Sequence, residues 1–319
     1  MNDLSNASES GRVLISGASG MMGQRIRAAL AAEGCSVFQL VRRAATQSNE
    51  IQWNPTLAGG GGHELAPSCI EHPERIEGVA AAVHLSGANI AAQRWTTAWK
   101  QAMWASRVDS TRALSQALAR LRRPPAVLVC ASAIGWYGDR GDDLLNEDAA
   151  SGSGFFPELC RAWESAARPA MEAGIRVVHL RLGIVLSRDG GALGRMVPLF
   201  RVGLGGRLGS GDQWMSWISE QDAVRAFQFA IQTPTLRGAV NAVAPEPVTN
   251  RAFTRELAHR LHRPALAPAP AWALRLAFGE MADEALLASA RAVPSRLLAA
   301  GFHFEHAELQ AALQVAVQA

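Results

Sequence analysis

The sequence predicts an α/β fold: a doubly wound parallel sheet with helices on both faces, followed by a smaller, mostly helical region. Three observations predict it. Apolar, strand-like runs alternate with helical patterns from residue 12 to about 185, which is typical of a covered parallel sheet. The first run passes through a glycine-rich turn straight into a helical pattern. Beyond residue 187, glycines and prolines divide the chain into shorter pieces.

Each predicted element has its own signal. Short apolar runs predict strands, and apolar residues at helical spacing predict helices. The expected strands are 12–16, 36–41, 80–85, 126–131, 175–182 and 238–243. The expected helices are 22–33, 96–120, 155–173, 220–232, 250–261, 271–290 and 305–317. Prolines and a glycine run from Gly59 to Gly62 predict a loop over 54–68, and closely spaced glycines predict that 187–219 is mostly loop.

Composition excludes several classes of protein. The 319 residues are 49% apolar and 18% charged, with a formal net charge of +3, as in ordinary globular proteins. No basic run is long enough for a nucleic-acid or membrane surface, and no run of 18 apolar residues predicts a membrane span. The polar start lacks the order of a signal peptide, so we expect a disordered tail over 1–10. The four cysteines are scattered without a C-x-x-C pair, which favours a cytoplasmic protein without disulfides or a metal site.

The glycine-rich turn has the sequence GASGMMG, residues 17–23, between an apolar run and a helical pattern. Glycines let a backbone approach phosphates closely, and the free N–H groups of a helix start attract negative charge. A strand and a helix flank the motif, which is the context that it requires. We therefore predict a Rossmann-type dinucleotide site; the alternative is a plain structural turn. Its predicted coenzyme-binding residues are Gly17, Ser19, Gly20, Met21, Met22 and Gly23.

The second strand indicates which coenzyme is bound. An acidic residue about 20 positions beyond the glycines binds the ribose 2′-hydroxyl in NAD-specific folds. This strand instead ends in Arg42 and Arg43, and guanidinium groups match the geometry of a phosphate. The pair favours NADP(H) over NAD(H). The alternative is a solvated basic loop.

Further motifs extend over nearly the whole chain after residue 10. They are VLISGASG at 13–20, VHLSGAN at 83–89, SRVDST at 106–111, SAIGWYG at 132–138, WE at 163–164, LRLGIVL at 180–186, GSGDQ at 209–213, SWI at 216–218 and NAVAPE at 241–246. With them the chain resembles the extended short-chain dehydrogenase/reductases. More narrowly, it resembles an atypical branch of NAD(P)-dependent epimerase-family proteins that carry a small C-terminal domain of the DUF1731 type.

The resemblance implies further coenzyme contacts and an organisation of the chain. Leu85, Ser86 and Gly87 would lie beneath the adenine-side ribose, Arg107 near the coenzyme, and Gly183, Ile184 and Val185 beside the nicotinamide. An NADP-binding domain would span 11–186, completed by about 220–245. The substrate-binding region would comprise 187–219 and 246–319. Extended members often form dimers, so the resemblance also suggests a homodimer.

The residues that normally perform the chemistry of this family are missing. Its active members use a tyrosine and, four residues later, a lysine, which lowers the tyrosine pKa and holds the ribose. The matching positions here carry Phe156 and Cys160, and the chain has one tyrosine, Tyr137, and one lysine, Lys100. The usual proton relay is therefore absent. An inert, buried role for Cys160 is favoured over a reactive thiol.

Other polar residues could act in its place. Tyr137 and Ser132 follow the fifth predicted strand, near the expected substrate position, and are candidate catalytic residues; the alternative for Tyr137 is a structural hydrogen bond. Gln213 and Ser216 could bind a substrate while Trp214 forms an apolar wall. The alternative there is a structural loop anchored by tryptophan.

Two functions are compatible with these residues. The leading hypothesis is an NADP(H)-binding epimerase-like or oxidoreductase-like protein that acts on an unknown small molecule without the Tyr-x-x-x-Lys pair. The second, the alternative, is a catalytically silent NADP(H)-binding sensor or regulatory protein. The missing pair favours the second, and the glycine turn and the arginine pair fit both.

Overall fold

The computed structural model describes residues 11–56 and 68–318 of the chain. The expected tail over 1–10 and the glycine run from Gly59 to Gly62 lie outside the described residues. Within them, no helix combines the length and the apolar character needed to cross a membrane.

A seven-stranded parallel sheet forms the centre of the molecule, in the order β11-β7-β5-β4-β1-β2-β3. The strands are β1 (Arg12–Ser16), β2 (Ser36–Val41), β3 (Glu50–Gln52), β4 (Ala81–His84), β5 (Val127–Ala133), β7 (Arg176–Leu182) and β11 (Gly238–Ala242). The predicted fold class and all six predicted strands are confirmed. The strand β3 was not predicted, because three residues are too few to show a pattern. The chain order reverses between β1 and β4, the position at which doubly wound sheets bind ligands.

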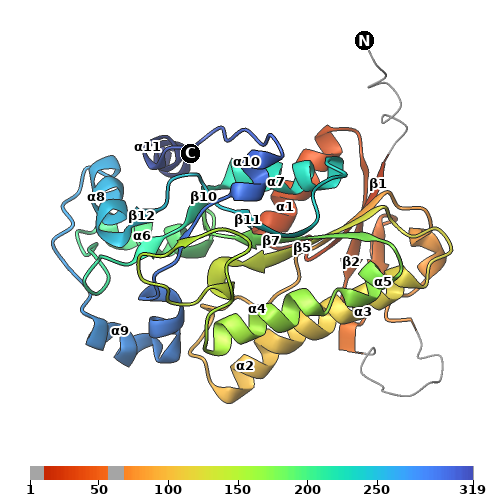
Figure 1. Cartoon of the computed structure of the whole chain (residues 1–319), viewed down its shortest axis with the longest axis horizontal. Helices are drawn as coiled ribbons and strands as arrows, with labels where there is room; N and C mark the ends of the chain where they lie inside the picture. The colour runs from red at the N-terminus through yellow and green to blue at the C-terminus, as the bar shows by residue number, and fades with distance from the viewer. Residues whose placement is uncertain (1–10, 57–67, 319) are drawn as a thin grey trace, which may run out of the picture.

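Helices cover both faces of the sheet (Figure 1). On one face lie α1 (Met21–Ala32) and α7 (Glu220–Gln232); on the other lie α3 (Ser110–Ala119), α4 (Phe155–Ser165) and α5 (Arg168–Glu172). Alternate side chains of a strand point to opposite faces. Accordingly Val13 packs in a core cluster with Ile26 of α1, and Leu14 packs in another with Leu114 of α3.

Two predicted helices are interrupted. The segment expected as one helix over 96–120 consists of α2 (Thr97–Trp104), a π-helical turn (Ala105–Asp109) and α3. The segment over 155–173 divides into α4 and α5. A helical pattern does not reveal such breaks because the apolar spacing continues across them.

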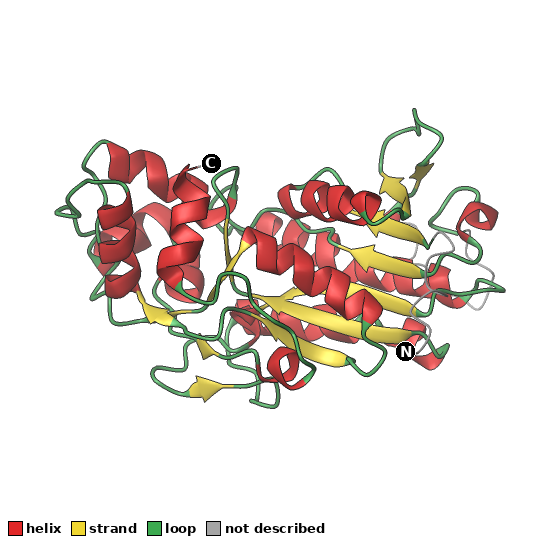
Figure 2. Cartoon of the chain, turned by 90° about the horizontal axis from the view of Figure 1, so that it is seen from above, coloured by secondary structure: helices red, strands yellow, loops and turns green. Residues whose placement is uncertain are grey.

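The rest of the chain forms a smaller region at one end of the sheet, on the left in Figures 1 and 2. Its helices are α6 (Gly191–Arg201), α8 (Asn250–Arg260), α9 (Ala271–Phe278) and α11 (Leu309–Gln318), whereas α10 (Ser295–Ala299) lies against β11 of the sheet, with Leu297 in the core of the larger part. Three short strand pairs join its parts: β8 (Ile184–Leu186) with β10 (Trp217–Ser219), β9 (Trp214–Met215) with β12 (Val248–Thr249), and β6 (Leu144–Leu145) with β13 (Arg291–Ala292). Leu193, Phe200, Phe253 and Leu313 form its core.

The expectation that 187–219 is mostly loop was wrong for α6. Glycines at both 191 and 194 and a proline at 198 lower the helix propensity of this segment. Leu193, Val197 and Phe200 nevertheless lie at helical spacing and are buried, so burial of this face outweighs propensity. The predicted helix over 271–290 ends at Phe278, because Gly279 follows with φ +61°.

Candidate functional site

The glycine turn lies where the ends of β1 and β4 meet. Gly17 has φ +73°, and a Cβ there would lie 2.8 Å from the carbonyl carbon of Leu85 and 3.0 Å from the Ser86 nitrogen. Glycine is therefore required both by the backbone conformation and by the contact. The contact also joins two segments predicted to bind the coenzyme, 17–23 and 85–87.

The start of α1 lies directly on this turn. A Cβ at Gly23 would lie 2.2 Å from the Gly17 oxygen, so only glycine permits this packing. The helix has no side-chain cap and no acidic residue in its first turn. Ser19 and Gly20 are exposed in front of it. An uncapped helix start behind exposed glycine backbone fits a pyrophosphate group.

The segment after β7 reaches the same turn. Met21 of α1 lies beside Gly190, where a Cβ would come within 3.0 Å of its sulfur. Arg25 forms ion pairs with Asp189 and, at 2.6 Å, with Glu220. The predicted nicotinamide-side residues, Gly183, Ile184 and Val185, thus belong to a segment attached to α1.

The two arginines after β2 differ in their partners. Arg43 donates to both carboxylate oxygens of Glu50, at 2.6 and 2.8 Å, and Thr46 completes the cluster. These hydrogen bonds lower the pKa of Glu50 to about 2. Arg42 is exposed, and its side chain has no hydrogen bond or ion pair with any residue that the structure describes. Of the pair, Arg42 is the guanidinium available to a phosphate.

Phe156 and Cys160, predicted to stand at the family's tyrosine and lysine positions, lie on α4 near the end of β5. Phe156 fills the space beside Gly135, where a Cβ would lie 2.7 Å from its ring. Cys160 is fully buried, and burial raises its pKa to about 12. A thiol with this pKa is protonated at neutral pH, which supports the inert alternative.

Ser132 and Tyr137 belong to a buried polar network. Arg181 of β7 pairs with both oxygens of Glu164, at 2.8 and 2.9 Å, and Ser132 donates to the same carboxylate at 2.7 Å. Although burial opposes the charge, hydrogen bonds with Glu164 and Tyr137 raise the pKa of Arg181.

Tyr137 completes this network from a fully buried position. Its hydroxyl lies 2.7 Å from Asn241 Oδ1 and 3.0 Å from the Asn146 carbonyl oxygen, and Arg181 donates to it at 3.1 Å. Burial raises the tyrosine pKa. A hydroxyl with these partners supports the structural alternative, and the catalytic role of Tyr137 and Ser132 stays a prediction.

The predicted substrate-binding residues are also engaged within the protein. Gln213 donates to the carbonyl oxygens of Leu208 and Leu286. Trp214 donates to Asp142 at 2.6 Å, and Ser216 donates to Ala290 at 2.7 Å. The bonds to Leu286 and Ala290 connect the loop to the chain before β13, and the bond to Asp142 connects it to the chain before β6. Such contacts are expected of a structural loop; a role in substrate binding stays a prediction.

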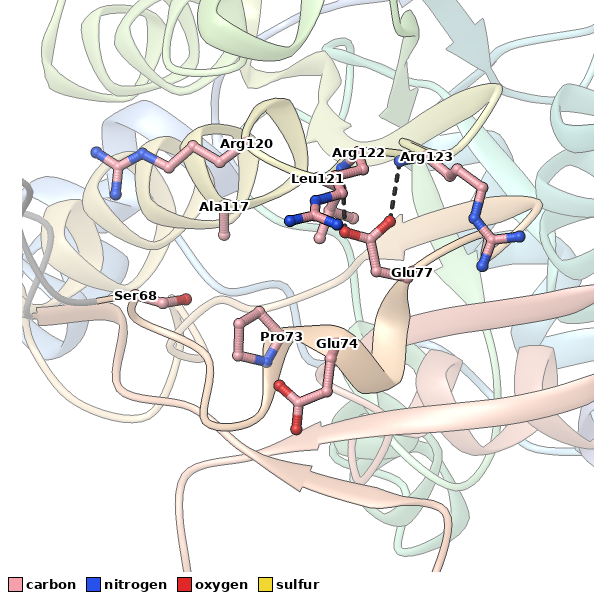
Figure 3. Close-up of a pocket in the computed structure, with 9 residues that line it drawn as sticks. All are labelled: Ser68, Pro73, Glu74, Glu77, Ala117, Arg120, Leu121, Arg122 and Arg123. Carbon is pink, nitrogen blue, oxygen red and sulfur yellow. Dashed lines mark hydrogen bonds between the residues drawn. The ribbon is translucent and has the colours of Figure 1, made fainter.

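A cavity of about 700 Å³ lies away from these residues. It is bounded by Pro73 and Glu77 before β4 and by the segment after α3, where Glu77 accepts from the backbone of Arg122 and Arg123 (Figure 3). These segments precede β4 and β5, so the cavity lies at the amino ends of the strands. Ligands of doubly wound sheets bind at the carboxyl ends, so this cavity is not the coenzyme site.

Most residues that bond to Arg181 and Tyr137 in the buried network could not be predicted from the sequence. Asn241 and Glu147 come from segments far from Arg181 in the chain. One signal was present: an arginine within the apolar run of β7 must find a partner if the strand is buried. The apolar run around Arg181 therefore indicates that this arginine needs a partner, but it does not indicate which residue the partner is.

The chain matches one known family and one known domain, and it is similar to curated proteins. The model of the NAD dependent epimerase/dehydratase family matches residues 13–242, and a domain of unknown function (DUF1731) matches residues 269–316. The chain is similar to the epimerase family protein Mb2239 of Mycobacterium bovis, with 47% identity over 94% of this chain and 96% of that protein.

Solved structures are similar as well. The crystal structure of the human epimerase family protein SDR39U1 (isoform2) with NADPH has a TM-score of 0.84 and 33% identity, covering 96% of this chain and 98% of that one. A nucleoside-diphosphate sugar epimerase from Corynebacterium glutamicum has a TM-score of 0.77 and 31% identity, covering 96% of this chain and 58% of that one.

Proposed function

Because the chain belongs to the NAD dependent epimerase/dehydratase family, we propose that it binds NADP(H) at the carboxyl end of β1 and β4. The turn over 17–23 would hold the pyrophosphate, and Arg42 the 2′-phosphate. The human relative crystallised with NADPH supports the choice of coenzyme. The observation that carries the proposal is the difference between the arginines: Glu50 occupies Arg43 and leaves Arg42 available.

The residues at the predicted catalytic positions limit the chemistry that can follow coenzyme binding. A nicotinamide coenzyme supplies a hydride donor or acceptor when bound. The family's proton donor and its lysine are replaced by Phe156 and Cys160, and Tyr137 is buried among hydrogen-bond partners. These features favour an NADP(H)-binding protein with a sensing or regulatory role. The second candidate is an epimerase or oxidoreductase that takes its proton from another group, a possibility that the relatives' epimerase-family names support.

The affinity for the two coenzymes tests the assignment. We expect wild-type protein to bind NADPH more tightly than NADH in calorimetry. The Arg42→Ala variant should bind NADPH about tenfold or more weakly, because a hydrogen bond to a charged group contributes about 1.5–3 kcal/mol. Its affinity for NADH should stay within about twofold. Equal weakening for both coenzymes would contradict the assignment of Arg42 to the 2′-phosphate.

Turnover separates the two candidate functions. Purified protein is incubated with NADPH and a panel of aldehydes, ketones and nucleotide sugars while absorbance of the reduced ring is followed. Tight binding without turnover supports the silent protein. NADPH oxidation that depends on one of these compounds supports the enzyme.

A further inference from the structure

Four large apolar side chains of the smaller region are exposed to solvent. Leu199 lies in the last turn of α6, Val202 and Leu204 follow that helix, and Leu266 lies between α8 and α9. Their exposed fractions are 52%, 69%, 63% and 80%. A contiguous group of exposed apolar side chains marks an interaction surface, whereas isolated ones need no explanation. We call these four residues the apolar patch.

Backbone hydrogen bonds bring the members of the apolar patch together. The Leu204 nitrogen donates to the Leu199 carbonyl oxygen at 2.9 Å, so the chain turns back at the end of α6. The Ala267 nitrogen donates to the Gly205 carbonyl oxygen at 3.2 Å, and the two segments continue side by side in the same direction. Leu204 and Leu266 directly precede these two bonded residues. The patch therefore joins the end of α6 to the connection between α8 and α9, which runs along the left edge of Figure 1.

The charge around the apolar patch is positive. Residues 190–211 and 257–279, which contain the patch, include six arginines and no aspartate or glutamate. Three of the six have an acidic neighbour elsewhere in the chain: Arg207, Arg260 and Arg275. The other three are exposed and form no ion pair with any residue that the structure describes; they are Arg195, Arg201 and Arg263.

The local structure places these three arginines beside the apolar patch. Arg195 precedes Leu199 by four residues on α6, so the two exposed side chains share one face of that helix. Arg201 stands directly before Val202. Arg263 Nε donates to the Arg201 carbonyl oxygen at 3.0 Å, which joins the chain after α8 to the end of α6. The sequence shows no basic run because the arginines belong to two segments that only the fold brings together.

An exposed apolar group among unpaired arginines fits the surface of a bilayer with anionic phospholipids. Such a surface offers phosphate groups to guanidiniums and an apolar interior to leucine and valine side chains. A second copy of the chain fits less well, because a symmetric contact would set the same arginines against one another. Single-stranded nucleic acid stacks its bases on aromatic side chains, and the patch has none. We propose that the apolar patch docks the protein on a membrane that carries anionic phospholipids.

This surface is separate from the predicted coenzyme site. The start of α6 lies near the glycine turn, since Gly190 lies beside Met21. The patch lies at the other end of the same helix, whose 11 residues span about 16 Å. Membrane docking therefore goes beyond the proposed function, and its test does not depend on coenzyme binding.

Co-sedimentation of the full chain with vesicles tests the proposal. We expect wild-type protein to bind vesicles of phosphatidylcholine with about one third phosphatidylglycerol, and to bind phosphatidylcholine alone about tenfold or more weakly. Leu204→Ser should weaken binding to the anionic vesicles about tenfold, because it removes an apolar side chain from the contact. The matched control is Leu298→Ser, which changes a half-exposed leucine of α10, the helix against β11, and should leave binding unchanged.

A charge variant tests the arginines. Arg201→Gln combined with Arg263→Gln should weaken binding to the anionic vesicles about tenfold or more, because each arginine near an anionic surface adds to the attraction. The control, Arg112→Gln combined with Arg122→Gln, removes the same charge from exposed positions in and just after α3 and should have a much smaller effect. Melting temperatures show that the compared variants are folded.

The outcomes are distinguishable. Wild-type protein that binds neither kind of vesicle overturns the proposal, as does folded Leu204→Ser protein that binds anionic vesicles as tightly as wild type. Equal binding to both kinds of vesicle also overturns it, because the arginines would then contribute nothing. A wild-type dimer in sedimentation equilibrium that Leu204→Ser dissociates would instead assign the patch to a second copy of the chain. NADPH affinity tests the proposed function independently, so the two proposals can fail separately.

Discussion

Arg181 shows how a single residue organises the polar interior near the candidate site. It lies in a buried strand and is held by Glu164 of α4, while its remaining donors face Tyr137 and the Glu147 carbonyl oxygen. Replacing one member of such a network leaves the others buried without partners. The sequence placed Tyr137 correctly after β5, but its partners come from distant segments that a local pattern cannot contain.

Tyr137→Phe tests whether this hydroxyl is structural. Removing it leaves Asn241 Oδ1 and one Arg181 donor without their partner, so the free energy of unfolding should fall by about 1–3 kcal/mol. The affinity for NADPH should change by less than about twofold. Urea unfolding and calorimetry measure the two quantities. Unchanged stability together with loss of an NADPH-dependent turnover would instead assign a catalytic role to Tyr137.

At the scale of elements, the glycine turn and α1 form one unit. Gly17 permits contact with the segment after β4, and Gly23 permits contact between α1 and the turn, whereas Gly20 faces solvent. The glycines are therefore not equivalent. Their spacing predicted a dinucleotide turn, and the structure assigns a separate reason to each glycine.

Alanine substitutions at Gly23 and Gly20 should separate packing from binding. A Cβ at Gly23 would overlap the Gly17 oxygen, so Gly23→Ala should lower the free energy of unfolding by at least about 2 kcal/mol. At Gly20 the nearest contact is 3.4 Å, so Gly20→Ala should change stability by less than about 1 kcal/mol.

Binding should change differently in the two variants. The Cβ of Gly20→Ala enters the space in front of α1, so we expect NADPH to bind about tenfold more weakly to a folded protein. Thermal melts and calorimetry on both variants measure these effects. A Gly20→Ala variant with full affinity would show that the phosphates do not approach this residue.

At the scale of the whole molecule, the C-terminal region supports the helix that carries Phe156 and Cys160. The N-terminus of α4 has no side-chain cap of its own. Glu284, in the π-helical turn after α9 (Ala282–Leu286), accepts from the Phe155 and Phe156 nitrogens at 3.1 and 2.9 Å. A carboxylate at a helix N-terminus stabilises it, so a residue of the region matched by the domain of unknown function stabilises α4.

Glu284→Ala tests this long-range cap. Loss of a capping carboxylate costs about 0.5–2 kcal/mol, so we expect a drop of about 1–2 kcal/mol in the free energy of unfolding. The matched control is Asp283→Ala, which removes an exposed pair with Arg275 and should cost less than about 0.5 kcal/mol. Equal effects of the two variants in urea unfolding would show that the cap contributes nothing.

The sequence by itself determined the parallel α/β fold, the glycine turn and the fact that no tyrosine of this chain is followed four residues later by a lysine. These features are local: alternating apolar runs, a seven-residue motif and the residue types at two positions. Only the tertiary structure distinguished Arg42 from Arg43, since the deciding Glu50 lies on β3, a strand too short to predict. It likewise revealed the buried partners of Tyr137, because hydrogen bonding in a core depends on which distant segments the fold brings together.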